Sequence, residues 1–151
     1  MTSFKHILDP VCAAVGVAAD TKEAALAQAV EILAKNGKVP DSAGLLREVL
    51  SRESLAPTAI GEGVALPHAL SASVPETMFA VLRLARAVDF GADDGGPVDI
   101  IFLIAGPRNE TSAHLKLLSK LARLLHDEKF RAALRSAADG RSLAELLYEK
   151  D

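Results

Sequence analysis

The chain is poor in several residue types, and each shortage excludes a class of protein. It has one cysteine, one tyrosine and no tryptophan, and aromatic residues make up 4% of its 151 residues. A lone cysteine, Cys12, excludes a disulfide framework within the chain and fits a reducing compartment. We expect Cys12 to be a small buried apolar side chain. No apolar run approaches the length of a membrane span, and the N-terminal MTSFKHILDP lacks the apolar segment of a signal peptide. We therefore expect a cytoplasmic protein with no direct membrane insertion.

A strong charge of one sign is also missing. The formal net charge is -3, and residues of both signs are interspersed. Because no basic patch with interleaved aromatics is visible, a nucleic-acid partner has little support. Half of the residues are hydrophobic, so we predict a core of leucine, isoleucine, valine and alanine. The length and the absence of repeats or linkers indicate a single domain, residues 1–151.

Hydrophobic periodicity predicts strands embedded between helices. Residues 1–10 are predicted to be a short helical turn or loop. The predicted strands are 11–17, 77–84 and 98–105, with a short edge strand at 87–90. The predicted helices are one from a capping box at 20–23 to Asn36-Gly37, one from Asp41 to about Arg52, one from Thr111 or Ser112 to about His126, one from Asp127 to Asp139-Gly140, and a last one from a capping box at 142–145.

Two of these strands are almost continuously apolar, TMFAVLRL at 77–84 and VDIIFLIA at 98–105. A strand that is apolar on both sides needs cover on both sides. We therefore predict an α/β or α+β sandwich, in which helices flank both faces of a mixed parallel and antiparallel sheet.

One stretch, Glu53 to His68 (ESLAPTAIGEGVALPH), differs in kind from the rest. It reads as a loop with two close glycines, Gly61 and Gly63, which allow backbone conformations that a Cβ forbids. A short apolar run follows, and Pro67 then removes a donor and ends regular pairing. The pattern describes a histidine on a stiff, buried stem. Taken alone, a histidine after a proline is more often a surface turn residue, so the residues themselves leave both interpretations open.

This stretch resembles the active-site segment of the mannitol/fructose-type (type 2) enzyme IIA of the bacterial phosphoenolpyruvate-dependent phosphotransferase system. The family pattern is an acidic or amide residue, six variable positions, an aliphatic and a small residue, two variable positions, then aliphatic-Ala-aliphatic-Pro-His. It is met without a gap by Glu53, Ile60, Gly61 and residues 64–68. A second pattern, His-Leu-x-x-Leu-Ser, is met by residues 114–119. The resemblance spans nearly the whole chain and is strongest to the stand-alone nitrogen-regulatory enzyme IIA.

The resemblance implies a phosphoryl carrier that accepts phosphate from a phosphohistidine of an HPr-type carrier protein. His68 would be the nucleophile, through its Nε2, and His114 would hydrogen-bond the phosphoryl group. Arg52 would be a further donor, and so would backbone amides near Gly61 and Gly63. Without the resemblance, His114 would be a helix residue facing water and Arg52 a cation favourably placed at a helix C-terminus. No metal or organic cofactor is implied, and the downstream partner would be an enzyme IIB or a regulatory target.

The chain departs from the family at two positions, Pro57 where serine or threonine is usual and Ala59 where glycine is usual. These departures leave the loop geometry and the partner preference open. Two other functions also stay open: a sugar-specific enzyme IIA that passes phosphate to an enzyme IIB, or a non-catalytic binding module on the same fold. A metal-dependent hydrolase built on the two histidines with Glu62 or Glu110 has little support, because no ligand spacing typical of metal sites occurs. The sequence leaves undecided the sugar or regulatory target, the HPr-type donor, the effect of Pro57 and Ala59, and the oligomeric state.

Overall fold

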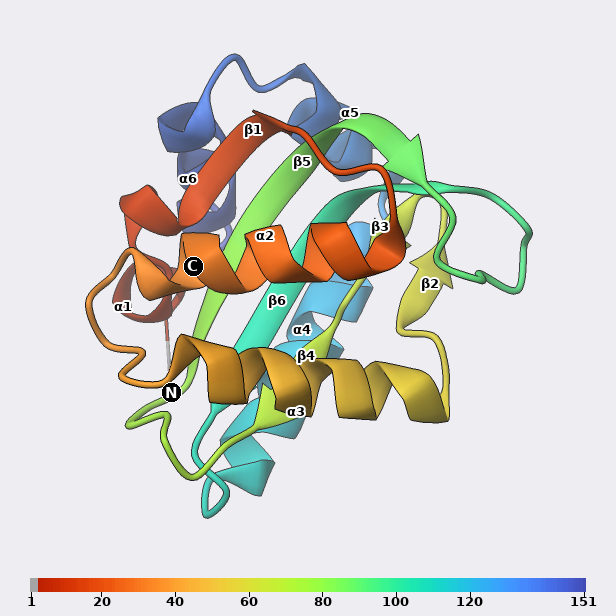
Figure 1. Ribbon diagram of the computed structural model, residues 1–151. Coiled ribbons are helices and arrows are strands. Elements are labelled where there is room, and N and C mark those ends of the chain that lie inside the picture. Colours follow the sequence, from red (N-terminus) through yellow and green to blue (C-terminus); the bar gives the residue numbers. More distant parts are fainter. Residues whose placement is uncertain (1–2) are drawn as a thin grey trace.

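The computed structural model describes residues 3–151 (Figure 1). Residues 1 and 2, part of the predicted N-terminal turn or loop, lie outside the described residues. The helices are α1 (Phe4–Ile7), α2 (Lys22–Ala34), α3 (Ser42–Leu55), α4 (Thr111–Leu125), α5 (Glu128–Ser136) and α6 (Gly140–Tyr148), with a 3-10 turn at Pro10–Cys12. The strands are β1 (Ala13–Val17), β2 (Ala59–Gly61), β3 (Val64–Ala65), β4 (His68–Leu70), β5 (Met78–Val88) and β6 (Val98–Gly106).

The strands form one mixed sheet, which confirms the predicted architecture. Their order is β1-β5-β6-β3-β2. β4 also pairs with β6, nearer to the C-terminal end of β6 than β3 does. β1 runs parallel to β5, and β3 and β4 run parallel to β6, whereas β5/β6 and β2/β3 are antiparallel. β6 is thus the strand against which the segment that carries His68 is aligned.

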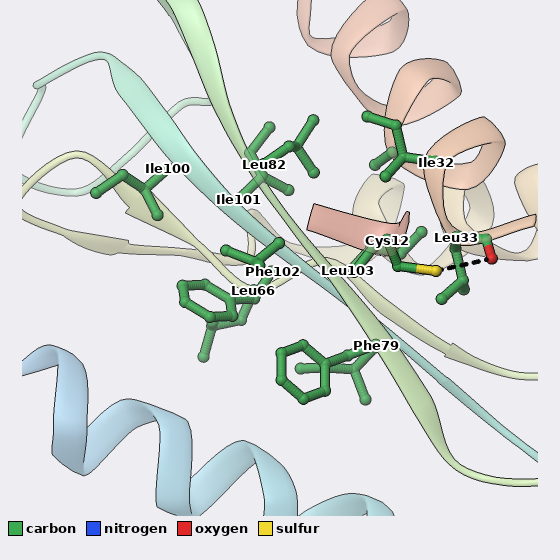
Figure 2. Close-up of a cluster of buried hydrophobic side chains, with 14 of the residues drawn as sticks. Cys12, Ile32, Leu33, Leu66, Phe79, Leu82, Ile100, Ile101, Phe102 and Leu103 are labelled. Carbon is green, nitrogen blue, oxygen red and sulfur yellow. Dashed lines mark hydrogen bonds between the residues drawn. The ribbon is translucent and has the colours of Figure 1, made fainter. Parts of the chain in front are cut away.

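Helices cover both faces of the sheet, as predicted. α2 and α3 lie on one face, and α4, α5 and α6 lie on the other (Figure 1). Between these layers every residue from Ile100 to Ala105 of β6 is at most 1% exposed. All five phenylalanines of the chain are also at most 5% exposed, so the predicted aliphatic core was incomplete. Cys12 is fully buried, as expected, and its thiol donates to the carbonyl of Leu33 at 3.4 Å (Figure 2).

One strand and one helix extend beyond their predicted ends, because strand pairing and packing continue past those residues. β5 continues to Val88, which pairs with Val98 of β6, so there is no separate edge strand at 87–90. α3 continues to Leu55, three residues beyond the predicted end. Arg52 and Glu53 are therefore helical, and the stretch from Glu53 to His68 is a helix end followed by three short strands rather than a loop.

Three helix starts also differ from the predicted caps. The N-cap of α2 is Thr21, whose hydroxyl accepts from the amide of Ala24 at 3.0 Å. The N-cap of α4 is Glu110, whose side chain makes no capping bond. The N-cap of α6 is Asp139, which accepts from the amide of Ser142 at 2.8 Å, so the glycine predicted to end the preceding helix is the first residue of this one.

Among the helices of residues 3–151, none is both long enough and apolar enough to traverse a bilayer.

Candidate functional site

His68 is the first residue of β4 and is paired with Ile104 near the C-terminal end of β6. The preceding residues 64–67 are buried, and His68 itself is half-buried, as the predicted stem requires. Its Nδ1 lies 2.8 Å from the carbonyl oxygen of Leu66. Because a carbonyl can only accept, Nδ1 carries the proton and Nε2 keeps a free lone pair. The neutral ring is thus a nucleophile with a fixed tautomer.

His114 lies on α4, the helix that follows β6, and its ring packs against that of His68. The two ring centroids are 5.3 Å apart, with the planes at 60°. His114 is only 4% exposed, so it does not face water as a first-turn helix residue usually would. The parallel pairing of β4 with β6 brings the two histidines together, since α4 begins just beyond the end of β6.

The ring nitrogens of His114 are buried and without partners. Within residues 3–151, neither Nδ1 nor Nε2 has a hydrogen-bond partner. An unsatisfied buried polar group costs about 1–3 kcal/mol, so such groups in a native protein call for a reason. A buried imidazole whose nitrogens have no partner, next to the lone pair on Nε2 of His68, is well suited to bind a polar group attached to that nitrogen.

Both histidines are neutral at pH 7. Burial, and to a smaller extent the proximity of His68, lower the pKa of His114 to about 4. Burial also lowers the pKa of His68 and the charge of Arg52 adds to this, while the Leu66 carbonyl and the charge of Glu53 act in the opposite direction. A neutral His68 is the form that has a lone pair to donate.

Arg52 acts on this pair through its charge alone. It is half-buried in the last turn of α3, and its Nη1 donates to the carbonyl oxygen of Ala56 at 3.1 Å. In the described part of the chain its side chain makes no hydrogen bond to either histidine. Its charge nevertheless acts on the pKa of His68, so it is within electrostatic reach of that ring.

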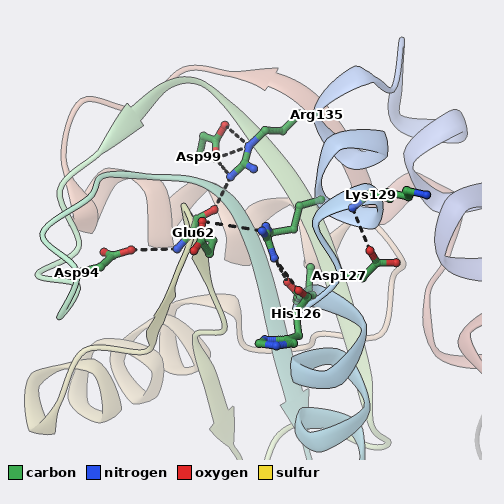
Figure 3. A network of polar contacts seen from close by, with 9 residues as sticks. Glu62, Asp94, Asp99, His126, Asp127, Lys129 and Arg135 are labelled. Atoms are coloured by element: carbon green, nitrogen blue, oxygen red, sulfur yellow. Dashed lines mark hydrogen bonds and ion pairs between the residues drawn. The ribbon is translucent and has the colours of Figure 1, made fainter.

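Gly61 and Gly63 lie away from the histidines, which corrects the expectation that amides near them line the site. They flank Glu62 in the turn between β2 and β3, and all three residues have positive φ. Val64 pairs with Ile100, whereas His68 pairs with Ile104, so about 13 Å of β6 separates the two places. The turn faces Asp94, Asp99 and Arg135 instead (Figure 3). The structure explains both glycines by the backbone conformation of this turn.

Sequence reasoning missed a polar cluster under the segment that carries His68. Glu53 is 6% exposed and forms an ion pair with Lys22 at 2.7 Å. Its carboxylate also accepts from the amide and the hydroxyl of Thr58, the residue between the two departures from the family pattern. One signal was present in the sequence: Lys22 stands in the first turn of a helix, where a cation is disfavoured unless a carboxylate balances it.

No metal centre is found within the described ranges: there, no three His, Cys, Asp or Glu side chains are gathered in a way that could hold a metal ion.

Comparison with known proteins identifies the family. Residues 6–150 match the family described as "Phosphoenolpyruvate-dependent sugar phosphotransferase system, EIIA 2". A nitrogen regulatory protein of Pseudomonas aeruginosa is 32% identical over 99% of this chain and 97% of its own length. The 2-O-alpha-mannosyl-D-glycerate-specific EIIABC component of Escherichia coli is 39% identical over 86% of this chain, which spans only 20% of that protein.

Structural comparison agrees with the sequence comparison. The crystal structure of nitrogen regulatory protein IIA-Ntr from Neisseria meningitidis has a TM-score of 0.83 and 29% sequence identity. The match covers 93% of this chain and 96% of that one. The likeness therefore extends over the sheet and both helical layers.

Proposed function

The chain belongs to the EIIA 2 family of the phosphoenolpyruvate-dependent sugar phosphotransferase system, and from this premise we propose that it carries a phosphoryl group on Nε2 of His68. The observation that carries the proposal is the histidine pair. His68 has its proton held on Nδ1 by the Leu66 carbonyl, and the buried His114 lies 5.3 Å away, centroid to centroid, with free nitrogens.

The proposed reaction is an in-line transfer between two histidines. The lone pair on Nε2 of His68 attacks the phosphorus of a phosphohistidine on the donor protein. A P–N bond forms to His68 as the P–N bond of the donor breaks, and the donor imidazole leaves with that electron pair. The proton of His68 stays on Nδ1, hydrogen-bonded to the Leu66 carbonyl, so the positive charge that the ring gains when Nε2 is phosphorylated lies next to an acceptor. Positioning and electrostatics supply the catalysis.

His114 and Arg52 would act on the charge of the phosphoryl group. Neutral His114 has one N–H to donate to a phosphoryl oxygen, and this bond would satisfy a donor that is otherwise unpaired. Donors fixed in a dry site stabilise developing charge more than donors in water. Arg52 would add a positive charge at longer range, and its guanidinium could turn from Ala56 toward an oxygen as a planar fork.

The proposed partners are other proteins of the relay. An HPr-type phosphocarrier would be the donor. The match to a nitrogen regulatory protein over nearly the full length of both chains favours a regulatory role, in which a target protein senses whether His68 is phosphorylated. The match to an EIIABC component supports the second candidate, a sugar-specific enzyme IIA that passes phosphate on to an enzyme IIB.

A reconstituted relay tests the site. The protein is mixed with phosphoenolpyruvate, enzyme I and an HPr-type carrier, and acid-labile phosphate is located by mass spectrometry. We expect one phosphate, on His68, and none in His68→Ala. The matched controls are His6→Ala and His126→Ala, because both side chains are exposed and should be dispensable. Labelling of His68→Ala at the level of the native protein would refute the assignment.

A second step separates the two roles. Purified phosphorylated protein is mixed with a mannitol-type or fructose-type enzyme IIB, and phosphate is followed on both chains. Stable phosphate on His68 in the presence of an active IIB agrees with the regulatory role, whereas rapid loss to the IIB would establish the sugar-transport role.

A further inference from the structure

Glu53 is a buried carboxylate that the proposed reaction does not touch. It lies in the last turn of α3 and is only 6% exposed. A buried charge is costly unless it is paired and hydrogen-bonded. Glu53 meets both conditions. Its role can therefore be inferred from the groups that its hydrogen bonds hold in place.

The carboxylate of Glu53 accepts two hydrogen bonds from Thr58. Oε2 accepts from the amide of Thr58 at 2.8 Å, and Oε1 accepts from the Thr58 hydroxyl at 2.6 Å. The Nζ of Lys22 balances the charge at 2.7 Å and also donates to the carbonyl oxygen of Phe90 at 3.2 Å. Thr58 is 7% exposed, so water does not compete for these bonds.

Thr58 in turn holds the residue that orients His68. The amide of Leu66 donates to the carbonyl oxygen of Thr58 at 3.1 Å. The carbonyl of Leu66 accepts from Nδ1 of His68 at 2.8 Å. That carbonyl belongs to the peptide bond with Pro67, which has no N–H with which to anchor it. On the N-terminal side, the carbonyl therefore depends on the bond between Leu66 and Thr58.

We propose that Glu53 is a positioning residue for the nucleophile: through Thr58 and Leu66 it fixes the carbonyl that keeps the proton of His68 on Nδ1 and the lone pair on Nε2. The inference rests on the proposed phosphorylation of His68 and deepens it. The same carboxylate also raises the pKa of His68 against the lowering by burial, so it acts on the ring by charge as well as by geometry.

Two substitutions of Glu53 separate geometry from charge. Glu53→Gln keeps an oxygen for the Thr58 amide and an N–H₂ group for the Thr58 oxygen, but it removes the charge that balances Lys22. Glu53→Ala removes both hydrogen bonds to Thr58 as well as the charge. Thr58→Val deletes only the hydroxyl contact at nearly constant volume, and it serves as the second route if Glu53→Ala does not fold.

The first readout is the tautomer of His68, measured from its imidazole ¹⁵N chemical shifts in the unphosphorylated protein. We expect the Nδ1–H form in the native protein and in Glu53→Gln. We expect a mixture of both tautomers in Glu53→Ala and a smaller change of the same sign in Thr58→Val. The second readout is the rate of phosphoryl acceptance from an HPr-type carrier. We expect this rate to fall about 10- to 100-fold in Glu53→Ala, as misplacement of a reacting group predicts.

The matched control is Val49→Ala, which opens a cavity at a buried position of the same helix. Val49 is not among the hydrogen-bond partners of Thr58. This substitution should lower the melting temperature and leave the tautomer unchanged. The proposal is overturned if Glu53→Ala keeps the native tautomer and rate, or if Thr58→Val keeps the native tautomer when Glu53→Ala does not fold. It is also overturned if Glu53→Gln loses as much of the native tautomer and rate as Glu53→Ala, or if Val49→Ala shifts the tautomer as well.

This design keeps the two proposals apart. The tautomer measurement needs no phosphate, so it decides the role of Glu53 even if the relay leaves His68 unmodified. Conversely, native protein that is phosphorylated on His68 while Glu53→Ala behaves like it would retain the proposed function and discard this inference.

Discussion

At the scale of single residues, His114 combines burial with two unpaired ring nitrogens, and this combination defines what its substitution should do. His114→Ala removes the proposed donor to the phosphoryl group and leaves the docking surface almost unchanged, because the side chain is 4% exposed. We expect phosphoryl transfer to His68 to slow about 100-fold, the usual effect of losing one fixed donor in a dry site. Stopped-flow transfer from an HPr-type carrier, with carrier binding measured by calorimetry, checks this.

The complementary variant is His114→Gln, which retains an N–H donor of similar reach. It should recover part of the rate that His114→Ala loses. A native rate in His114→Ala would assign the residue to packing alone, and an equal loss of carrier binding would assign it to docking.

Cys12 gives an independent residue-scale prediction. Burial raises its pKa to about 11, and nearby Asp9 contributes in the same direction, so almost no thiolate is present at pH 8. Since the thiolate is the reactive form, Cys12 should resist alkylation in the folded protein and react fully in denaturant. Mass spectrometry after iodoacetamide treatment reports both. Rapid alkylation of the native protein would show that the region around Cys12 opens.

The residue scale also shows where sequence reasoning succeeds. His68 and His114 were predicted as site residues from the resemblance to a known family, and the structure brings them together. The burial of His114 could not be predicted, because it depends on the parallel pairing of His68 with Ile104, a contact across 36 positions of sequence. The cluster of Lys22, Glu53 and Thr58 could not be predicted for the same reason. Nothing local in the sequence shows that the start of α2 lies against the end of α3.

At the scale of elements, a substitution in the turn between β2 and β3 tests whether Gly63 supports the fold of the turn and not the site at His68. An added Cβ there would lie 2.5 Å from Nη2 of Arg135 and 3.0 Å from Oδ1 of Asp99, and the residue has a φ of +78°. We expect Gly63→Ala to destabilise the fold by about 3 kcal/mol, part from backbone strain and part from displacing Arg135. Urea unfolding measures this. Because the turn is about 13 Å along β6 from His68, the folded variant should accept phosphate at the native rate.

Gly95→Ala is the matched control for that prediction. Gly95 has a similar φ of +75°, but an added Cβ would meet nothing within 4 Å. Its cost should be backbone strain alone, about 1 kcal/mol. Equal losses in both variants would contradict the clash with Arg135, and a slowed transfer in Gly63→Ala would return the turn to the functional site.

Element boundaries were predicted least well, and the reasons are tertiary. α3 extends past Arg52 because Glu53 is held by Lys22 and Thr58, partners that lie outside the helix. Asp139 caps α6, so the glycine that follows opens the helix instead of ending the preceding one. That glycine is also required: a Cβ on Gly140 would lie 2.1 Å from the carbonyl oxygen of Ala13 in β1. Local pattern identifies a helix, and neighbouring elements decide where it starts and ends.

At the scale of the whole molecule, the apolar strands predicted the layers correctly. Once 77–84 and 98–105 were read as buried on both faces, a sheet between two helical layers followed. The strand order did not follow, because three of the six strands have two or three residues and carry almost no periodicity. One of those short strands begins with His68, so the part of the fold that matters most for the proposed function was the part least visible in the sequence.

Burial of His114 makes the stability of the whole molecule depend on pH. Its pKa is about 4 in the folded protein against 6.5 for a free histidine, so between these values the unfolded chain binds more protons. Stability is therefore complete above about pH 6.5 and falls as the pH drops toward 4. Since each pKa unit corresponds to about 1.4 kcal/mol, the free energy of unfolding should fall by about 2 kcal/mol between pH 7 and pH 5. The lowered pKa of His68 acts in the same direction.

Urea unfolding of the native protein and of His114→Gln at several pH values between 5 and 7.5 measures this dependence. The lowered pKa values of Asp94 and Asp139 do not enter, because those carboxylates stay ionised throughout this window. His114→Gln has no group that titrates at this position, so its unfolding free energy should vary less with pH, whatever its absolute value. Parallel profiles for the two proteins would mean that His114 is protonated in the fold as readily as in water, and a charged ring there would then bind the phosphoryl group as a cation instead of a neutral donor.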